Sequence, residues 1–186
     1  VFIPPHHENL DELMSDFEKF LHNENTKLPH LVKIAIAHYQ FETIHPFLDG
    51  NGRIGRLLIT LYLVSNNLLT KPTLYLSDFF EKNKNLYYDN LNNVRLNNNL
   101  TQWIKFFLEG VRITSENSIN TFRKIIKLKS EIENELIKLG RKQRIAKQLI
   151  NYLYGKPIIN IEEAADVLNV NFSTASRLIR DMTKNG

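Results

Sequence analysis

Hydrophobic and polar positions divide the chain into helical stretches separated by short polar turns. A helical pattern ends near Ile44, and from Arg53 the chain becomes strongly apolar, as a buried helix would be. A long, more polar helical pattern follows over about 113–139. No apolar run reaches the length of a membrane span, and no signal-peptide pattern is present. The pattern therefore predicts a mainly α-helical protein that does not enter a membrane.

The last quarter of the chain predicts a small module of its own. Its expected elements are, in order, an amphipathic helix over 144–154, a short strand over 158–161, a short helix over 162–168, a turn over 169–171, and a helix from an N-cap at Ser173 to about Lys184.

Charge and cysteine content refine this division. Residues 1–140 contain sixteen Lys/Arg and sixteen Asp/Glu, whereas residues 141–186 contain eight and four, so the net charge of +4 lies in the last quarter. We therefore expect a catalytic domain over 1–140 and a second module over 141–186. The chain has no Cys, which excludes disulfides and suits a reducing compartment, so we expect a cytoplasmic protein.

Residues 45–56, His-Pro-Phe-Leu-Asp-Gly-Asn-Gly-Arg-Ile-Gly-Arg, are the most informative segment. Pro46 disfavours helical geometry at His45 and ends the preceding helix. Gly50 and Gly52 permit positive φ and leave the backbone open to a ligand. The free N–H groups that follow would form a helix N-terminus, which is a binding site for anions.

The charged side chains of the segment fit chemistry on a nucleotide phosphate. Arg53 and Arg56 are three residues apart and can reach the same helix end. Asp49 offers oxygen to Mg²⁺, and His45 can take a proton from an incoming nucleophile. Taken singly, each residue has a simple structural explanation as a turn or helix-end residue. The joint pattern is far more specific, and it is not a Walker A loop.

The segment resembles the Fic (Fido) family motif HPFx[D/E]GNGRxxR at every defining position. Softer similarities extend the resemblance over about residues 1–110: residues 37–44 resemble the approach helix, and residues 1–5 resemble the end of a flap hairpin. The resemblance implies an all-α Fic-type bundle with a short N-terminal flap β-element. It favours the AMP-transferring branch, since the related Doc-type kinases carry Lys where this chain has Gly52.

The resemblance also implies a role for each position. His45 is the expected general base, which deprotonates a Ser, Thr or Tyr hydroxyl on a target protein that then attacks ATP. Asp49 is the expected Mg²⁺ ligand, and Arg56 the expected γ-phosphate contact. The nucleotide-binding set comprises Phe47, Gly50, Asn51, Gly52, Arg53, Gly55, Arg56, Tyr88 and Leu91. Within it, Asn51 belongs to the anion hole, Phe47 is a core anchor of the loop, and Tyr88 and Leu91 line the adenine pocket.

Residues 141–186 resemble the winged helix-turn-helix modules often appended to Fic domains. In that interpretation Ser173, Thr174, Arg177 and Arg180 lie on the exposed face of the second helix and contact DNA. The alternative is that the module packs against protein and its basic residues are solvated. A wing hairpin would begin at residues 182–186.

Several alternatives stay open from the sequence. The Fic site could transfer UMP, phosphocholine or phosphate, or remove AMP, and the chain could be a DNA-binding regulator that senses a nucleotide. The target protein and the oligomeric state, a homodimer included, are not identified. Because the chain begins at Val1, inside the flap-like segment, we expect a truncated Fic domain. An inhibitory helix bearing Ser/Thr-x-x-x-Glu-Gly/Asn would then lie upstream, and its loss would raise self-modification activity.

Overall fold

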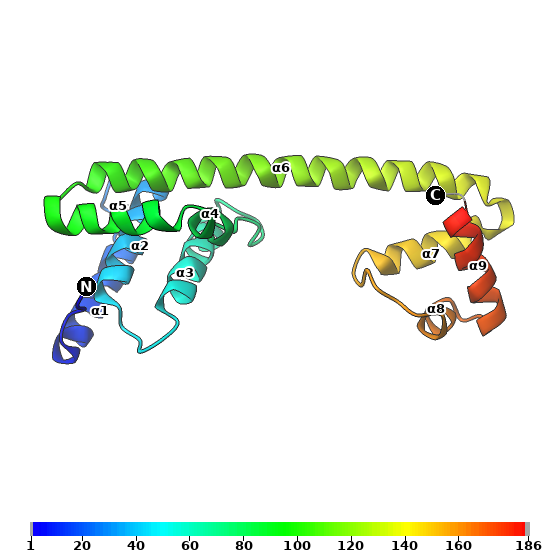
Figure 1. The fold of residues 1–186 in the computed structure, drawn as a ribbon, viewed down its shortest axis with the longest axis horizontal. Helices are drawn as coiled ribbons and strands as arrows, with labels where there is room; N and C mark the ends of the chain where they lie inside the picture. The colour runs from blue at the N-terminus through cyan, green and yellow to red at the C-terminus, as the bar shows by residue number, and fades with distance from the viewer. Residues whose placement is uncertain (1, 185–186) are drawn as a thin grey trace. The chain divides into compact units, whose positions relative to one another are not determined.

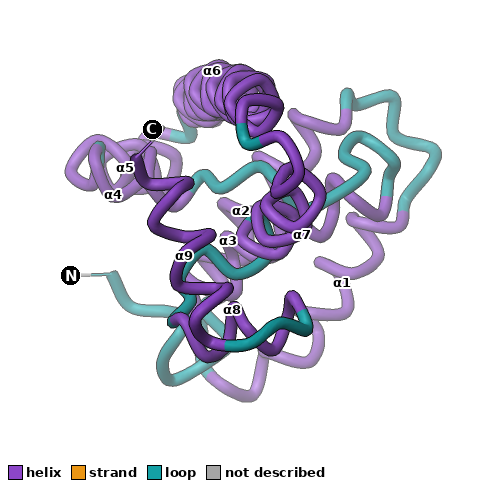
Figure 2. The backbone as a smooth tube through the Cα atoms, turned by 90° about the vertical axis from the view of Figure 1, so that its right-hand side faces the viewer, coloured by secondary structure: helices purple, strands orange, loops and turns teal. Residues whose placement is uncertain are grey.

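The computed structural model describes residues 2–184, and every regular element in that range is helical (Figure 1, Figure 2). The all-α class expected from the sequence is confirmed. The helices are η1 (His7–Asn9), α1 (Leu10–His22), α2 (His30–Ile44), α3 (Asn51–Ser65), α4 (Ser77–Lys82), α5 (Lys84–Asn97), α6 (Leu100–Lys138), η2 (Gly140–Lys142), α7 (Gln143–Leu153), α8 (Ile161–Leu168) and α9 (Phe172–Lys184).

The chain forms two compact units, each with an apolar core. The first ends at Asn120 and the second begins at Thr121, so the division falls inside α6. This is earlier than the boundary near Gly140 that the charge distribution indicates. Gly140 itself has a left-handed backbone and begins η2, which Leu139 separates from α6.

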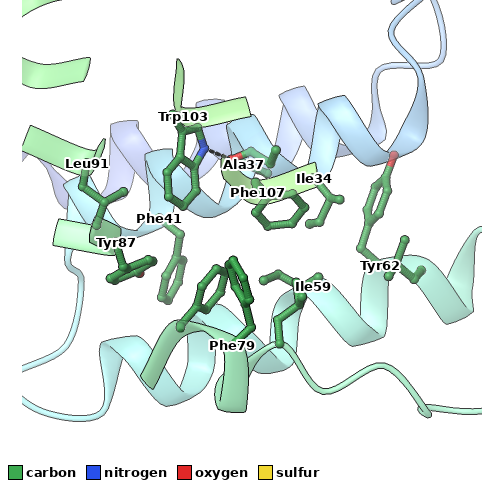
Figure 3. Close-up of a cluster of buried hydrophobic side chains, with 14 of the residues drawn as sticks. Ile34, Ala37, Phe41, Ile59, Tyr62, Phe79, Tyr87, Leu91, Trp103 and Phe107 are labelled. Atoms are coloured by element: carbon green, nitrogen blue, oxygen red, sulfur yellow. Dashed lines mark hydrogen bonds between the residues drawn. The ribbon is translucent and has the colours of Figure 1, made fainter. Parts of the chain in front are cut away.

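The core of the first unit is aromatic, and side chains from α2, α3, α4, α5 and α6 meet in it (Figure 3). Trp103 and Phe107 of α6 are fully buried against α2. The indole N–H of Trp103 donates to the carbonyl of Ala35 over 2.8 Å, which satisfies the one polar atom of that ring. These contacts fix α2, and α2 ends at the motif.

Helices α2 and α3 pack side by side, and the loop over 45–50 joins them (Figure 1). The α2 helix ends at Ile44 as predicted, because His45 leaves the helical region with φ 52° while its N–H still donates to the Phe41 carbonyl. The α3 helix begins at Asn51, two residues before Arg53, because Gly50 takes φ 85° and turns the chain directly into the helix.

The second unit confirms three expected elements and corrects two. The helices near 144–154 and 162–168 and the turn after Leu168 are present, and Asn169 takes φ 51° in that turn. The strand over 158–161 is wrong: Asn160 instead caps α8, its side chain accepting from the N–H of Glu163. Ser173 is not the cap of α9, because Asn171 accepts from the N–H of Thr174 over 2.8 Å.

Neither expected β-element of the two termini forms within residues 2–184. Residues 2–6 have no regular secondary structure, since a lone extended segment there has no neighbouring strand to bond, and Val1 lies outside the described range. Met182 to Lys184 belong to α9, and residues 185–186 of the expected wing also lie outside that range. No helix in the described part of the chain is long and apolar enough to span a bilayer.

Candidate active site

A cavity of about 330 Å³ opens where the α2–α3 loop meets helices α4 and α5. It brings together eight of the residues expected at the site: His45, Asp49, Gly50, Asn51, Gly52, Arg53, Arg56 and Tyr88. Leu48, Phe80, Glu81, Lys84 and Tyr87 complete its wall. The cavity therefore has a polar, mainly cationic wall from the motif and a second wall from α4 and α5.

His45 holds a backbone conformation that few non-glycine residues adopt. Its φ of 52° and ψ of 57° lie in the left-handed region, which costs roughly 1 kcal/mol or more for a residue with a Cβ. The next residue, Pro46, prevents the helix from continuing. The imidazole consequently lies beyond the end of α2, where it lines the cavity.

The two glycines of the loop make space for the two arginines. A Cβ at Gly52 would lie 3.2 Å from Nη1 of Arg56, and one at Gly50 would lie 3.5 Å from Nη2 of Arg53. Gly50 also needs its positive φ of 85°. Both guanidiniums therefore fold back over the N-terminus of α3, where the first N–H groups have no partner within the helix. This is an arrangement that binds anions.

Asp49 and Arg53 form an exposed ion pair at the mouth of the cavity. Nη2 of Arg53 donates to Oδ2 of Asp49 over 3.3 Å, and Oδ1 accepts from the N–H of Gly50 over 2.7 Å. The Asp49 side chain is 93% exposed, so surface screening keeps this pair weak.

The donor set fits Mg²⁺. That ion is commonly bound through one or two carboxylates, with water and substrate phosphates as its other ligands, and Asp49 lies beside the N-terminus of α3. A denser group of ligand atoms in the described part of the chain lies on His6, His7 and Glu8, all exposed and all outside this cavity.

The Asn51 side chain is hydrogen-bonded to the backbone of its own loop. Its Oδ1 accepts from the N–H of Phe47 over 2.9 Å, and its Nδ2 donates to the Phe47 carbonyl over 2.6 Å. The side chain is buried and closes the loop on itself, so both of its polar atoms are engaged by the backbone. Only its main-chain N–H, in the first turn of α3, is left for an anion.

A second cavity of about 710 Å³ shares His45 and Tyr88 with the first. Leu91 lines it, as do Leu96 and Asn92 of α5 and the N-terminal residues Phe2 and Ile3. Arg95 lies over the Phe2 ring, 3.7 Å from its centroid, and Glu42 completes the wall. A mostly apolar pocket with a few polar groups beside a phosphate-binding loop is typical of a nucleoside site.

Two residues of the expected nucleotide-binding set line neither cavity. Phe47 is half-exposed, and its ring packs on Phe41 instead of entering the core as an anchor. Gly55 lets α2 and α3 approach: a Cβ there would lie 2.7 Å from Oε1 of Glu42. Its contribution to the site is therefore close helix packing.

His38 supports the site from within the core. Its ring is fully buried and stacked between Phe80 and Trp103. Nδ1 lies 3.1 Å from the Gly55 carbonyl, which can only accept, so Nδ1 carries the proton and Nε2 accepts from the Tyr87 hydroxyl over 3.0 Å. Burial, reinforced by the charge of Arg56, lowers the pKa of His38 to about 4. The ring is thus a neutral structural link between α2, α3 and α5.

Sequence reasoning missed the wall residues supplied by distant segments. Phe80, Glu81 and Lys84 come from the α4–α5 region and Arg95 from α5, whereas Glu42 lies close to the motif but outside residues 45–56. The available signal was weak: Glu42 lies one turn before His45, and Arg95 lies one turn after Leu91 on the same helix.

The fold and the loop define a helical domain that carries an anion-directed motif between two packed helices. Residues 1–63 match the sequence profile of the Fic/DOC family, and the chain therefore contains a Fic/DOC family domain.

Named relatives agree with this assignment. Over 63 residues, 33% of this chain, the sequence is 46% identical to "Protein adenylyltransferase Fic" of Drosophila melanogaster and of Drosophila sechellia, and 44% identical to that of Drosophila yakuba. The matched stretch spans only 13% of the length of each relative. The crystal structure of a Fic family protein from Desulfovibrio desulfuricans G20 has a TM-score of 0.58 and 34% identity, covering 63% of this chain and 35% of that one.

Proposed function

We propose that this Fic domain is a protein adenylyltransferase, which transfers AMP from Mg-ATP to a Ser, Thr or Tyr hydroxyl of a target protein. The observation that carries the proposal is the shared cavity, in which a histidine, two arginines and the N-terminus of α3 converge. The similarity to proteins named as adenylyltransferases supports the same group transfer.

The proposed reaction is an in-line substitution at the α-phosphorus. His45 takes the proton of the target hydroxyl, and the oxygen forms a bond to the α-phosphorus. The bond from that phosphorus to the bridging oxygen breaks, and pyrophosphate leaves with the electron pair. Positioning and charge stabilisation supply most of the rate in such transfers.

Different residues of the two cavities are proposed to bind different parts of the nucleotide. Arg56 and Arg53 hold the polyphosphate, together with the N–H groups at the start of α3. Asp49 would hold Mg²⁺, which neutralises phosphate charge when bound. The second cavity receives the adenosine, with Tyr88 and Leu91 beside the base and Phe2 opposite.

Labelled ATP tests this proposal directly. AMP transfer predicts that label from the α-position appears on protein, either on a target or on the chain itself, and that label from the γ-position does not. Intact mass after Mg-ATP treatment reports self-modification. Label from the γ-position would indicate a kinase instead, and no label on any protein would favour a nucleotide sensor.

Two substitutions should separate the metal-binding group from the phosphate-binding group. Asp49→Asn keeps the acceptor for the Gly50 N–H but removes the charge, so more Mg²⁺ should be needed for half-maximal activity. Arg56→Ala should weaken binding of ATP far more than of AMP, because its contact is with the far phosphate. Titrations with ATP, AMP and Mg²⁺ measure both effects. Equal losses for ATP and AMP in both variants would contradict the division of roles.

The second unit has DNA binding as a second candidate function. Residues 121–184 contain thirteen Lys/Arg against seven Asp/Glu. Arg177 and Arg180 are exposed on α9, the second helix of an α8–turn–α9 pair. If α9 contacts phosphates, Arg177→Gln and Arg180→Gln should each weaken duplex binding by the full chain and reduce its salt dependence by about one charge. Duplex binding that neither substitution changes would contradict this candidate.

A further inference from the structure

Glu42 is the most unusual side chain near the two cavities. It lies in the last turn of α2, three residues before His45, and is only 8% exposed. Its Oε1 is fully buried and has no hydrogen-bond partner in the described part of the chain. Buried carboxylate oxygens are nearly always hydrogen-bonded, because desolvating them without compensation is costly. The arrangement therefore needs a compensating interaction of another kind.

The packing around Glu42 fixes where its carboxylate lies. A Cβ at Gly55 of α3 would come within 2.7 Å of Oε1, and His38 and Phe41 approach the same point from α2. On the α5 side, Nη2 of Arg95 donates to the Glu42 backbone carbonyl over 3.3 Å. The carboxylate thus lies against the backbone of α3. Glu42 also lines the second cavity, together with His45 and Arg95.

Three cationic or protonatable groups partly offset the burial of this carboxylate. The pKa of Glu42 is raised overall, because burial outweighs the nearby charges of His45, Arg56 and Arg95, which each act to lower that pKa. These groups come from the end of α2, from α3 and from α5. The other titratable groups facing it are His38, kept neutral by burial, and Tyr87, whose pKa is raised by burial and by the charge of Glu42.

We propose that Glu42 is a positioning residue of the AMP-transfer site, where its buried carboxylate, in the cavity wall that it shares with His45, favours the cation that forms when His45 takes the hydroxyl proton. This inference rests on the proposed function. When His45 takes the hydroxyl proton it becomes a cation beside a low-dielectric core, and a fixed carboxylate one turn away offsets the cost. Glu42 touches no reacting atom, so its effect passes through His45.

Glu42→Gln removes the charge and keeps the shape, so it isolates the electrostatic contribution. Residues that support a functional side chain without touching the substrate typically change activity by about 10–100-fold when they are mutated. We expect kcat to fall by that amount, whereas KM for ATP should change much less. Glu42→Asp keeps the charge and should recover part of the lost kcat. Glu12→Gln, an exposed carboxylate on α1, is the matched control and should behave like the wild type.

The outcomes separate positioning from packing. A purely structural residue would lower the midpoint of thermal unfolding in Glu42→Gln without a selective loss of kcat. Wild-type kcat in a folded Glu42→Gln protein would overturn the inference. So would a Glu42→Asp protein that folds normally but is no more active than Glu42→Gln.

A measurement without catalysis keeps this inference distinct from the proposed function. The His45 ring signal, assigned by comparison with His45→Ala, can be followed by NMR as pH changes. In Glu42→Gln the pH dependence of this signal should differ from that in the wild type, because a carboxylate in the same cavity wall has been removed. Identical titrations would refute the electrostatic link, whereas absent AMP transfer with a shifted titration would refute only the proposed function.

Discussion

Replacing His45 by alanine should lower AMP transfer by about 10²–10⁴-fold, which corresponds to roughly 3–5 kcal/mol of activation free energy. The imidazole lines both cavities and is the histidine of the motif placed to accept a proton from a bound hydroxyl. ATP binding should persist, because the proposed phosphate contacts come from Arg53, Arg56 and the N-terminus of α3, and not from His45. The measurement is transfer of α-label at saturating Mg-ATP, paired with ATP binding and thermal unfolding of the same protein.

The strained backbone at His45 calls for a second variant. At φ 52°, alanine changes the conformational cost as well as the chemistry, whereas asparagine tolerates the left-handed region well and is not a base. His45→Asn should therefore fold like the wild type and be as inactive as His45→Ala. Substantial transfer by His45→Asn would mean that the residue serves as a helix-terminating position and that the base lies elsewhere.

The second large effect concerns folding stability and pH. His38 is neutral in the folded protein, because burial lowers its pKa to about 4 from the 6.5 that is usual for an exposed ring. A depressed pKa means that the unfolded chain binds the proton more readily. The stability that the neutral ring contributes is therefore fully present above pH 6.5 and is lost as pH falls toward 4. At pH 4 the loss amounts to about 3 kcal/mol.

Urea unfolding of the wild type and of His38→Gln between pH 7.5 and 4 measures this contribution. Carboxylates also titrate in that window, so the comparison of the two proteins isolates the histidine. His38→Gln should be less stable than the wild type at pH 7.5, because it loses the ring stacking, but it should lose less stability on acidification. Parallel pH profiles for the two proteins would show that the buried ring carries no such linkage.

The local features of the site follow from the sequence, because they depend on residues close together in the chain. Pro46 and the glycines dictate where α2 ends, where α3 begins and why N–H groups point at the loop. The spacing of Arg53 and Arg56 along a helix places both at one end of it. These are short-range steric and hydrogen-bonding requirements, and the structure meets them within two residues.

The periodicity of the sequence also predicts the helices of the second unit. It does not predict the structure of residues 158–161 or the capping residue of α9. Three of the residues 158–161 are isoleucines, which favour a strand, yet a strand needs a partner, and the described part of the chain offers none there. Asn171 rather than Ser173 caps α9, because the choice between neighbouring capping residues depends on the path of the preceding turn.

The sequence by itself determined the motif, the helical class and the anion-directed end of α3. Only the tertiary structure decided which other residues surround the motif. Packing of α2 against α3 through Gly55 encloses Glu42, and packing of α5 brings Arg95 and Tyr88 to His45. Contacts between residues far apart in the chain depend on which helix faces meet, and burial then sets the electrostatics of each side chain.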